Sequence, residues 1–210
     1  MRNSNLIVFE GIDGAGKATQ VALLAKKLRS QGKTVSVFSS PRYDTPTGKL
    51  VKSALQGKFG NFVAMNAYFS ALPYLLDFAA ERDEVAAALK KGIVISDRYL
   101  PSTLAFHGAK LPKGEKKKFL IFVENLMYRD LKLPRPDRVI YLDVPVANAK
   151  KLLRGKKLDQ HEKDSEYQTR VANTYKALAK RKEWRTIVCA KNGEVLSKRA
   201  IHEKIWKAVQ

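Results

Sequence analysis

Residues 11–20 read Gly-Ile-Asp-Gly-Ala-Gly-Lys-Ala-Thr-Gln and directly follow a short apolar run, Leu-Ile-Val-Phe-Glu, at residues 6–10. The spacing Gly-x-x-x-x-Gly-Lys between a strand and a helix is that of a phosphate-binding loop. In such a loop, backbone N–H groups surround a nucleotide phosphate, the helix N-terminus adds a positive field, and the lysine reaches the β and γ oxygens. The residues expected to bind ATP are Gly11, Ile12, Asp13, Gly14, Ala15, Gly16, Lys17, Ala18 and Thr19.

One position departs from the phosphate-loop pattern. The residue after the lysine is usually Ser or Thr, whose hydroxyl binds Mg²⁺, but here it is Ala18, and a methyl group cannot coordinate a metal. Either Thr19 or a water molecule takes over this role, or Asp97 and the nucleotide phosphates hold most of the Mg²⁺. Because Lys17, Asp97 and Arg98 are all present, we expect an active site and not a vestigial one.

Working outward from the loop, short apolar runs alternate with longer helical patterns, as in a parallel sheet with crossover helices. The expected strands are residues 6–10, 34–39, 93–96, 139–143 and 186–189. The expected helices are residues 17–31, 47–56, 63–90 with Pro73 as a kink or break, 101–107, 116–128, 146–153, 165–182 and 196–209. The 210 residues therefore predict a single α/β domain, with loops at 108–114 and 155–162.

The composition is strongly basic, with 40 Lys and Arg against 20 Asp and Glu. Most of the excess lies in residues 110–118, 150–157 and 176–210, which invites the hypothesis of a nucleic-acid-binding protein. Three His and a single Cys leave no zinc-finger or disulfide framework. No apolar run approaches the length of a membrane span, so we expect a cytoplasmic protein without membrane association.

Residues 96–99, Ser-Asp-Arg-Tyr, end the third expected strand. The carboxyl ends of parallel strands meet at one edge of the sheet, so Asp97 and Arg98 should face the phosphate loop. A carboxylate suits a metal ion or its bound water, and a guanidinium suits a phosphate. Taken alone, the two residues could equally form an ordinary surface ion pair.

Several motifs together resemble the thymidylate kinase family. They are the phosphate loop, Ser-Ser-Pro-Arg at 39–42, Phe-Ala-Ala-Glu-Arg at 78–82, Asp-Arg-Tyr at 97–99 followed by Ser102 and Ala-Phe at 105–106, and Leu-Pro-Arg-Pro-Asp at 133–137. The resemblance runs in order from about Leu6 to the last expected helix. It implies a three-layer α/β/α P-loop kinase fold with a five-stranded parallel sheet and a short lid, and a homodimer.

The resemblance also implies a reaction, in which the γ-phosphoryl group of ATP, with Mg²⁺, is transferred to dTMP to give dTDP and ADP. Asp13 would orient the acceptor, Arg42 would clamp its 5′-phosphate, and Arg98 would draw both phosphates together. Phe78 would stack on thymine and Arg82 would bind its carbonyl. The implied substrate-binding residues are Asp13, Arg42, Phe78, Arg82, Arg98, Ser102 and Phe106, the last beside the deoxyribose, while His107 stands where many members have Gln.

A lid at residues 154–163 is the third part of the resemblance. Ala15 in the phosphate loop is small, and members without an arginine there carry the catalytic cations in the lid. Arg154, Lys156 and Lys157 fit that arrangement, although the sequence does not choose among them. Such cations would neutralise the transferring phosphoryl group, and a closed lid would exclude water. The expected catalytic residues are Asp13, Lys17, Arg98, Arg154, Lys156 and Lys157, with Asp97 at the metal.

Two alternatives remain at the level of sequence. A deoxynucleoside kinase would need a carboxylate base after the second strand to deprotonate a sugar hydroxyl, but residues 39–43 read Ser-Ser-Pro-Arg-Tyr. A nucleic-acid-binding protein with a vestigial ATP site would explain the basic charge, but no helix-turn-helix, RNP or zinc signature is present. We therefore expect at most weak, nonspecific nucleic-acid binding.

Overall fold

A five-stranded parallel sheet forms the centre of the computed structural model, which describes residues 5–153, 155 and 164–210. From one edge to the other, the strands are β2 (Val35–Ser39), β3 (Ile93–Asp97), β1 (Leu6–Glu10), β4 (Arg138–Asp143) and β5 (Trp184–Val188). Every residue of β1 is buried, as expected for a central strand covered on both faces. The predicted sheet is confirmed, and each strand lies within two residues of its predicted bounds.

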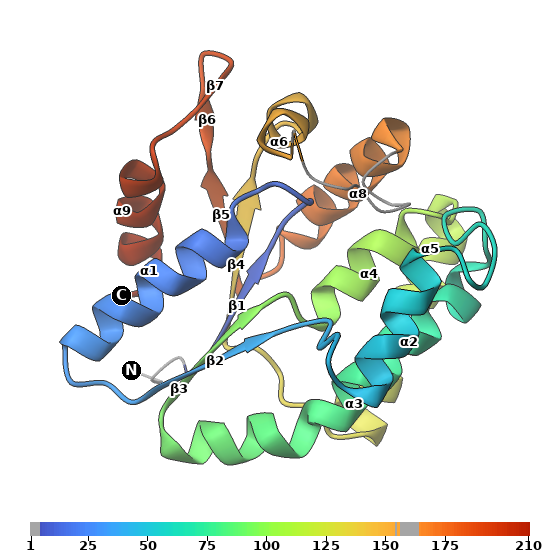
Figure 1. The fold of residues 1–210 in the computed structure, drawn as a ribbon, viewed down its shortest axis with the longest axis horizontal. Helices are drawn as coiled ribbons and strands as arrows, with labels where there is room; N and C mark the ends of the chain where they lie inside the picture. The colour runs from blue at the N-terminus through green and yellow to red at the C-terminus, as the bar shows by residue number, and fades with distance from the viewer. Residues whose placement is uncertain (1–4, 154, 156–163) are drawn as a thin grey trace.

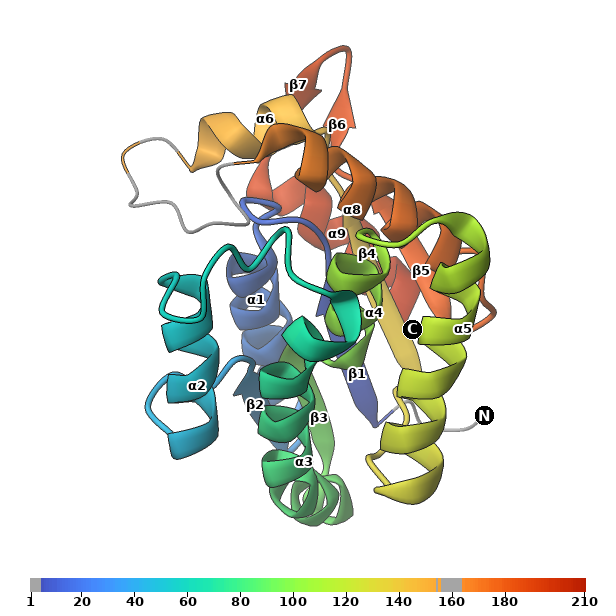
Figure 2. The ribbon, with the colours of Figure 1, turned by 90° about the vertical axis from the view of Figure 1, so that its right-hand side faces the viewer.

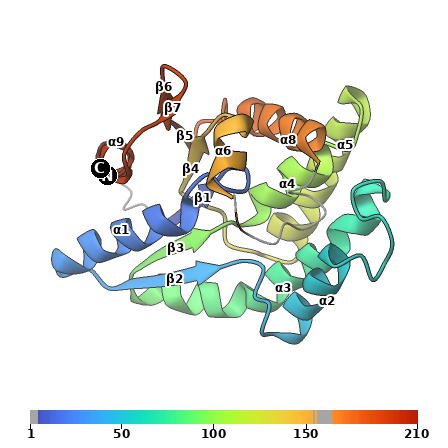
Figure 3. The same ribbon diagram turned by 45° about the horizontal axis from the view of Figure 1, so that its top comes forward.

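Helices cover both faces of this sheet and make three layers (Figures 1 and 3). On one face, α1 (Lys17–Ser30) packs against α9 (Lys198–Val209). On the other face, α4 (Leu100–Gly108) packs between α3 (Ala67–Lys91) and α8 (Ser165–Leu178). The remaining helices are α2 (Pro46–Leu55), α5 (Lys113–Glu124), the π-helical segment η1 (Asn125–Asp130) and α6 (Val146–Leu152).

The strand register brings the ends of β1 and β3 together. Phe9 of β1 pairs with Asp97 of β3, so the phosphate loop and Arg98 leave the sheet side by side. The connection that leaves β1 carries α1 on one face of the sheet, whereas the connection that leaves β3 carries α4 on the other face (Figure 1). Ligands of open α/β sheets bind at such switch points.

Three local features differ from the sequence prediction. Helix α3 begins at Ala67 instead of residue 63, and of the kink or break expected at Pro73 it shows no break. The expected loop at 108–114 is shorter, because α4 extends to Gly108 and α5 already begins at Lys113. A hairpin that the sequence prediction lacked, β6 (Ala190–Lys191) and β7 (Glu194–Val195), extends beyond β5 (Figure 2).

None of the helices in the described ranges is both long and apolar enough to cross a membrane.

Candidate active site

The phosphate loop is wrapped around the ammonium group of its own lysine. Lys17 Nζ donates hydrogen bonds to the carbonyl oxygens of Gly11 at 3.1 Å and Ile12 at 3.0 Å. Burial, together with the positive charge of Arg98, lowers the pKa of Lys17 to about 8. Gly14 has a φ of 80°, and a Cβ there would meet the carbonyl oxygen of Ala149, so this glycine lets the loop pack directly on α6.

Two carboxylates, Asp13 in the phosphate loop and Asp97 at the end of β3, are candidate ligands for a metal ion. Ala18 is exposed at the start of α1 and contributes no ligand atom. The carboxylates of Asp13 and Asp97 both lie close enough to Lys17 to raise its pKa, partly offsetting the effect of burial. In the described part of the chain, no three acidic, His or Cys side chains gather into a metal site. Mg²⁺ usually takes only one or two carboxylates and completes its shell with water and substrate phosphates, so this oxygen donor set suits it.

Arg98 links the phosphate loop to α4. Its guanidinium pairs with the carboxylate of Asp13 and donates to the Gly11 carbonyl at 3.2 Å and to Ser102 Oγ at 3.0 Å. Arg98 has a φ of 67°, a left-handed backbone conformation that costs energy for a residue with a Cβ. Burial alone would lower the pKa of Arg98, but the groups around it, Asp13 first and then Tyr175, Glu10 and Asp97, together outweigh burial and raise that pKa above its ordinary range. The arrangement fixes a permanent positive charge beside the phosphate loop.

Beneath Arg98 lies Glu10, a fully buried carboxylate that the sequence analysis did not assign to the site. Glu10 accepts hydrogen bonds from the backbone N–H of Tyr99 at 3.0 Å, Ser102 Oγ at 2.6 Å and the Tyr175 hydroxyl at 2.8 Å. Burial raises the pKa of Glu10, and the positive charge of Arg98, followed by these three donors, opposes the rise. The signal in the sequence was a glutamate at the end of an otherwise apolar central strand.

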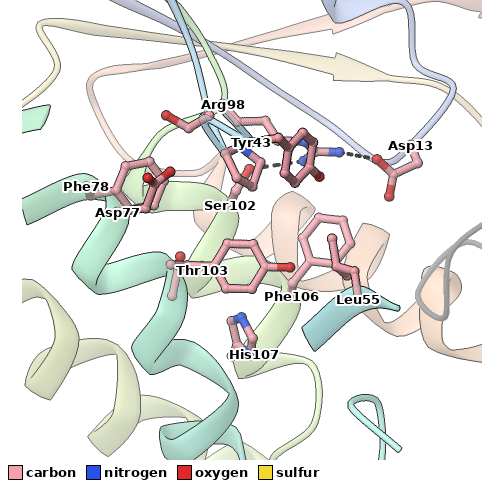
Figure 4. Close-up of a pocket in the computed structure, with 13 residues that line it drawn as sticks. Asp13, Tyr43, Leu55, Asp77, Phe78, Arg98, Ser102, Thr103, Phe106 and His107 are labelled. Atoms are coloured by element: carbon pink, nitrogen blue, oxygen red, sulfur yellow. Dashed lines mark hydrogen bonds and ion pairs between the residues drawn. The ribbon is translucent and has the colours of Figure 1, made fainter. Parts of the chain in front are cut away.

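A pocket of about 530 Å³, its open mouth included, extends from this network between α3 and α4 (Figure 4). The pocket is lined by Asp13, Ser40, Pro41, Tyr43, Leu55, Tyr74, Asp77, Phe78, Arg98, Ser102, Thr103, Phe106 and His107. Asp13 and Arg98 lie where it meets the phosphate loop, and Tyr74, Phe78 and Phe106 give it aromatic walls, as a bound phosphate and a bound planar ring would require (Figure 4).

Five of the predicted acceptor residues therefore lie together in one pocket. Asp13, Arg98 and Ser102 form its polar wall, and Phe78 and Phe106 belong to its aromatic lining. The guanidinium of Arg98 also lies over the ring of Phe106, at 5.1 Å from the ring centre.

Two other predicted residues do not line this pocket. Arg42 follows β2, but its guanidinium turns toward α3, where it lies 2.9 Å from Glu84 and 3.5 Å from Glu81. The side chain of Arg82 is 38% exposed and bonds Asp83 and the carbonyl oxygen of Leu131. On α3, Tyr74 lies four residues before Phe78, just as Arg82 lies four residues after it. Tyr74 and Phe78 both face the pocket.

The stretch of chain that contains the phosphate loop, the Asp-Arg-Tyr segment and the aromatic pocket matches a known protein family. The family model described as Thymidylate kinase matches residues 9–205. The chain belongs to the thymidylate kinase family.

Curated relatives in this thymidylate kinase family support the assignment. The thymidylate kinase of Mycobacterium tuberculosis is 32% identical over 183 residues, which cover 83% of this chain and 85% of that protein. A probable thymidylate kinase of Thermococcus onnurineus is 38% identical over 184 residues, covering 83% and 84% of the two chains. The resemblance inferred from the sequence motifs is thereby confirmed, and neither alternative is favoured.

A solved structure shows the same fold. The thymidylate kinase of Candida albicans superposes with a TM-score of 0.76 at 21% identity, covering 99% of this chain and 91% of that one. The predicted P-loop kinase fold is therefore confirmed. Of the catalytic residues that thymidylate kinase motifs suggested, Arg154, Lys156 and Lys157 lie outside the described residues.

Proposed function

We propose that the chain transfers the γ-phosphoryl group of ATP to dTMP, giving ADP and dTDP. The observation that carries this proposal is the contact of Arg98 with both the phosphate loop and Ser102 of the acceptor pocket. A guanidinium in that place can bind the acceptor phosphate on one side and the donor phosphates on the other. An acceptor phosphate oxygen then attacks the γ-phosphorus as its bond to ADP breaks, and no sugar hydroxyl has to be deprotonated.

The proposed roles in acceptor binding follow the pocket from its mouth inward. Asp13 and Arg98 hold the phosphate end, and Ser102, bonded to both Arg98 and Glu10, supports this junction. Phe106 packs beside the deoxyribose. The aromatic faces of Tyr74 and Phe78 then enclose the thymine ring.

Donor binding is proposed at the phosphate loop. Lys17 exchanges its two carbonyl partners for phosphate oxygens, and backbone N–H groups at the start of α1 surround the β-phosphate. Asp97 and Asp13 would hold Mg²⁺, which supplies neutralisation of the phosphate charge when it is bound. We propose that residues 154–163 act as a lid within a single domain, with Arg154, Lys156 and Lys157 as its candidate cations, and that the enzyme is cytoplasmic.

Coupled ADP release with dTMP, thymidine and dUMP as acceptors tests the function. We expect turnover that depends on dTMP, and a Lys17→Ala enzyme slower by about two to three orders of magnitude, because the charge on the transferring group is left unneutralised. Lys33→Ala, which removes an exposed lysine beyond the C-terminal end of α1, is the matched control. Turnover of thymidine with none of dTMP would contradict the proposal.

We also propose that two copies of the chain pair through α3. Phe69, Leu72 and Leu76 are each about half exposed and follow one another at helical spacing, with Leu50 and Phe59 exposed beside them. They belong to a groove with almost wholly apolar walls, and monomeric proteins rarely expose such a surface. A single apolar helical stripe is self-complementary about a two-fold axis, so a second copy is the occupant that best fits it.

A further inference from the structure

Strand β1 ends in a buried carboxylate that the proposed reaction does not use. Glu10 is the last residue of this strand, and its side chain is fully buried beneath Arg98. It accepts from the backbone N–H of Tyr99, from Ser102 Oγ and from the Tyr175 hydroxyl. Burial of a charged group is costly, and an apolar residue of similar size would suit a central strand better, so this carboxylate has a role other than packing.

Ser102 and Tyr175 both direct their hydroxyl protons at one oxygen of Glu10. Ser102 Oγ lies 2.6 Å from Oε2, and the Tyr175 hydroxyl oxygen lies 2.8 Å from it. The two hydroxyl oxygens are also 3.0 Å apart, so either could instead donate to the other. A carboxylate is the stronger acceptor and is nearer to both, so it takes both protons. Each hydroxyl has a single proton, and its oxygen is then left as an acceptor.

Arg98 is the donor that these two oxygens face. Its Nη1 donates to Ser102 Oγ at 3.0 Å, lies 3.4 Å from the Tyr175 hydroxyl oxygen and reaches the Gly11 carbonyl oxygen at 3.2 Å. The other end of the guanidinium pairs with Asp13, so the group lies between Asp13 and Ser102 (Figure 4). A guanidinium only donates, so it is held best by oxygens that have no proton pointing at it.

We propose that Glu10 is a positioning residue, which fixes the guanidinium of Arg98 by taking the protons of two neighbouring hydroxyls. With both protons on Glu10, the oxygens of Ser102 and Tyr175 face Arg98 as acceptors. The inference rests on the proposed function, because it concerns the arginine that bridges the donor and acceptor phosphates there. Glu10 is not among the described residues that line the acceptor pocket, and it acts through Arg98.

A fixed guanidinium matters most in the transition state of the transfer. Negative charge shifts between the donor and acceptor oxygens during the reaction, and donors already aimed at that charge need no rearrangement. A misplacement of about 1 Å in a catalytic site can slow a reaction by about a hundredfold. Loss of the Glu10 charge should therefore lower kcat far more than it raises KM.

Glu10→Gln removes the charge and keeps the shape of the side chain. An amide has one oxygen and one NH2 group, whereas the three groups bonded to Glu10 are all donors. If the NH2 group faces the backbone N–H of Tyr99, two donors meet beside Arg98. If it faces the two hydroxyls, they must accept from it, and their protons turn toward Arg98. Either arrangement disturbs the contacts that hold the guanidinium.

In Glu10→Gln we expect kcat with ATP and dTMP to fall by about tenfold to a hundredfold, with both KM values little changed. A protonated Glu10 would present the same pattern of donor and acceptor as the amide. An unchanged kcat would therefore mean that the carboxyl group carries no charge in the folded protein, and it would overturn the proposal.

Tyr175→Phe removes one of the oxygens that face Arg98 and keeps the ring. We expect kcat to fall by about three- to tenfold, as for the loss of one hydrogen bond. Tyr141→Phe is the matched control, because its ring stacks on that of Tyr175 while its hydroxyl bonds Asp143, 3.3 Å away. Equal kcat values in Tyr175→Phe and Tyr141→Phe would contradict the proposal.

Asp137→Asn separates positioning from stability. Asp137 accepts the backbone N–H groups of Asn5 at 3.0 Å and Leu6 at 2.9 Å, at the opposite end of β1 from Glu10. We expect this variant to lower the melting temperature, as Glu10→Gln does, and to leave kcat unchanged. A loss of kcat in Glu10→Gln no greater than in Asp137→Asn would show that Glu10 only stabilises the fold.

A double-mutant cycle tests whether Glu10 acts through the hydroxyls. In Tyr175→Phe, one of the two oxygens that Glu10 orients is already gone. Adding Glu10→Gln to that variant should therefore cost less in kcat than it costs in the unmodified protein. Losses that simply multiply would overturn the proposed route from Glu10 to Arg98.

Nitrogen-15 NMR of the arginine side chains gives a readout that needs no turnover. An Arg98→Lys sample identifies the signals of Arg98. In the unmodified protein we expect separate signals for its Nη atoms, because a guanidinium bonded at both ends rotates slowly about its Cζ–N bonds. In Glu10→Gln and Tyr175→Phe these signals should broaden or merge, whereas in Tyr141→Phe they should not. Equally sharp, separate signals in Glu10→Gln would overturn the proposal.

Failure of the two proposals can be told apart. If the unmodified protein phosphorylates no dTMP under any condition, the proposed function fails, and the NMR measurement still decides whether Glu10 fixes Arg98. If dTMP is phosphorylated but Glu10→Gln and Tyr175→Phe both keep the kcat of the unmodified protein, only the inference about Glu10 fails.

Discussion

Glu81 on α3 is a buried carboxyl group whose charge the fold only partly compensates. Its side chain is fully buried, Ser40 Oγ donates to it at 3.1 Å, and Arg42 Nε lies 3.5 Å away without making a directed hydrogen bond. Burial raises the pKa of Glu81 to about 7, and Ser40 and Arg42 oppose that rise. Glu81 thus titrates near neutral pH directly behind the arginine that the sequence analysis assigned to the acceptor phosphate.

This pKa predicts a pH dependence of stability. Because the folded-state pKa lies above the unfolded one near 4.5, the folded protein binds more protons between these values, and its free energy of unfolding falls as pH rises through that window. The fall from this group alone is about 3 kcal/mol. Urea unfolding at pH 5 and pH 8 should show it, and Glu81→Gln should flatten the slope. Glu194→Gln, at an exposed carboxylate on β7, is the control, and an equal slope in Glu81→Gln would contradict the assignment.

Ala18 predicts a change in metal dependence. The side chain at this position lies at the exposed start of α1, so a hydroxyl can be added there without disturbing buried groups. In Ala18→Thr the added oxygen should lower the Mg²⁺ concentration that gives half-maximal rate. Ala18→Val, which has nearly the same shape and no hydroxyl, should not. Superimposable Mg²⁺ titrations for all three proteins would show that this position does not reach the metal.

The sequence predicted the charged end of the site better than the aromatic end, for a physical reason. Asp13 and Arg98 follow strands whose parallel register leaves little freedom, so their meeting was foreseeable. On α3, by contrast, Tyr74 with Phe78 and Phe78 with Arg82 have the same four-residue spacing. The rotation of the helix about its axis determines which of these two pairs faces the pocket. Packing of the whole helix sets that rotation, so the contribution of Tyr74 was missed, while the assignment of Arg82 to the base stays a prediction.

Among the elements, the first turn of α2 depends on a glycine. Thr45 caps this helix by accepting from the N–H of Gly48, and a Cβ at Gly48 would overlap the backbone carbonyl of Arg42. Gly48→Ala should therefore destabilise the fold by about 1–3 kcal/mol, as overpacking against backbone does. Gly114→Ala is the matched control: it lies in α5 with open space around it and should be neutral or stabilising by up to about 1 kcal/mol. Equal melting temperatures for the two variants would contradict this.

The periodicity of the sequence predicted the long helices and strands. The short β6–β7 hairpin instead depends on the residues of its turn. Helix α3 tolerates Pro73 within its length, although proline removes one backbone donor. The β6–β7 hairpin was missed because each strand has only two residues, too few for an alternating pattern. Its turn, Asn192-Gly193, has positive φ at both positions, 51° and 80°, and an Asn-Gly pair is the sequence signal for such a turn.

For the whole molecule, the apolar stripe on α3 predicts a concentration-dependent dimer. Leu72→Glu places a charge in the middle of that stripe and should shift the mass measured by light scattering from dimer to monomer. Ile121→Glu, on α5 and equally exposed but outside the groove, should leave the mass unchanged. A monomer at all concentrations of the unmodified chain would contradict pairing through α3.

The net charge of +20 is also a property of the whole molecule. Several of its cations have internal partners: Lys17 and Arg98 are held in the site, Arg181 pairs with Glu124, and Lys27 lies over the ring of Trp206. Binding to duplex DNA should therefore be weak, and it should fall steeply with added salt. Submicromolar affinity at physiological salt, unaffected by dTMP, would contradict this expectation.

The contacts of Lys17 bear on the thermodynamics of ATP binding. Two backbone carbonyls hold the ammonium in the centre of the loop, so contacts within the loop itself maintain its shape. ATP then replaces existing hydrogen bonds and orders few residues of the loop, which keeps the entropic cost of association small. The heat of binding measured by calorimetry should accordingly reflect an exchange of partners at Lys17 rather than the folding of a disordered segment.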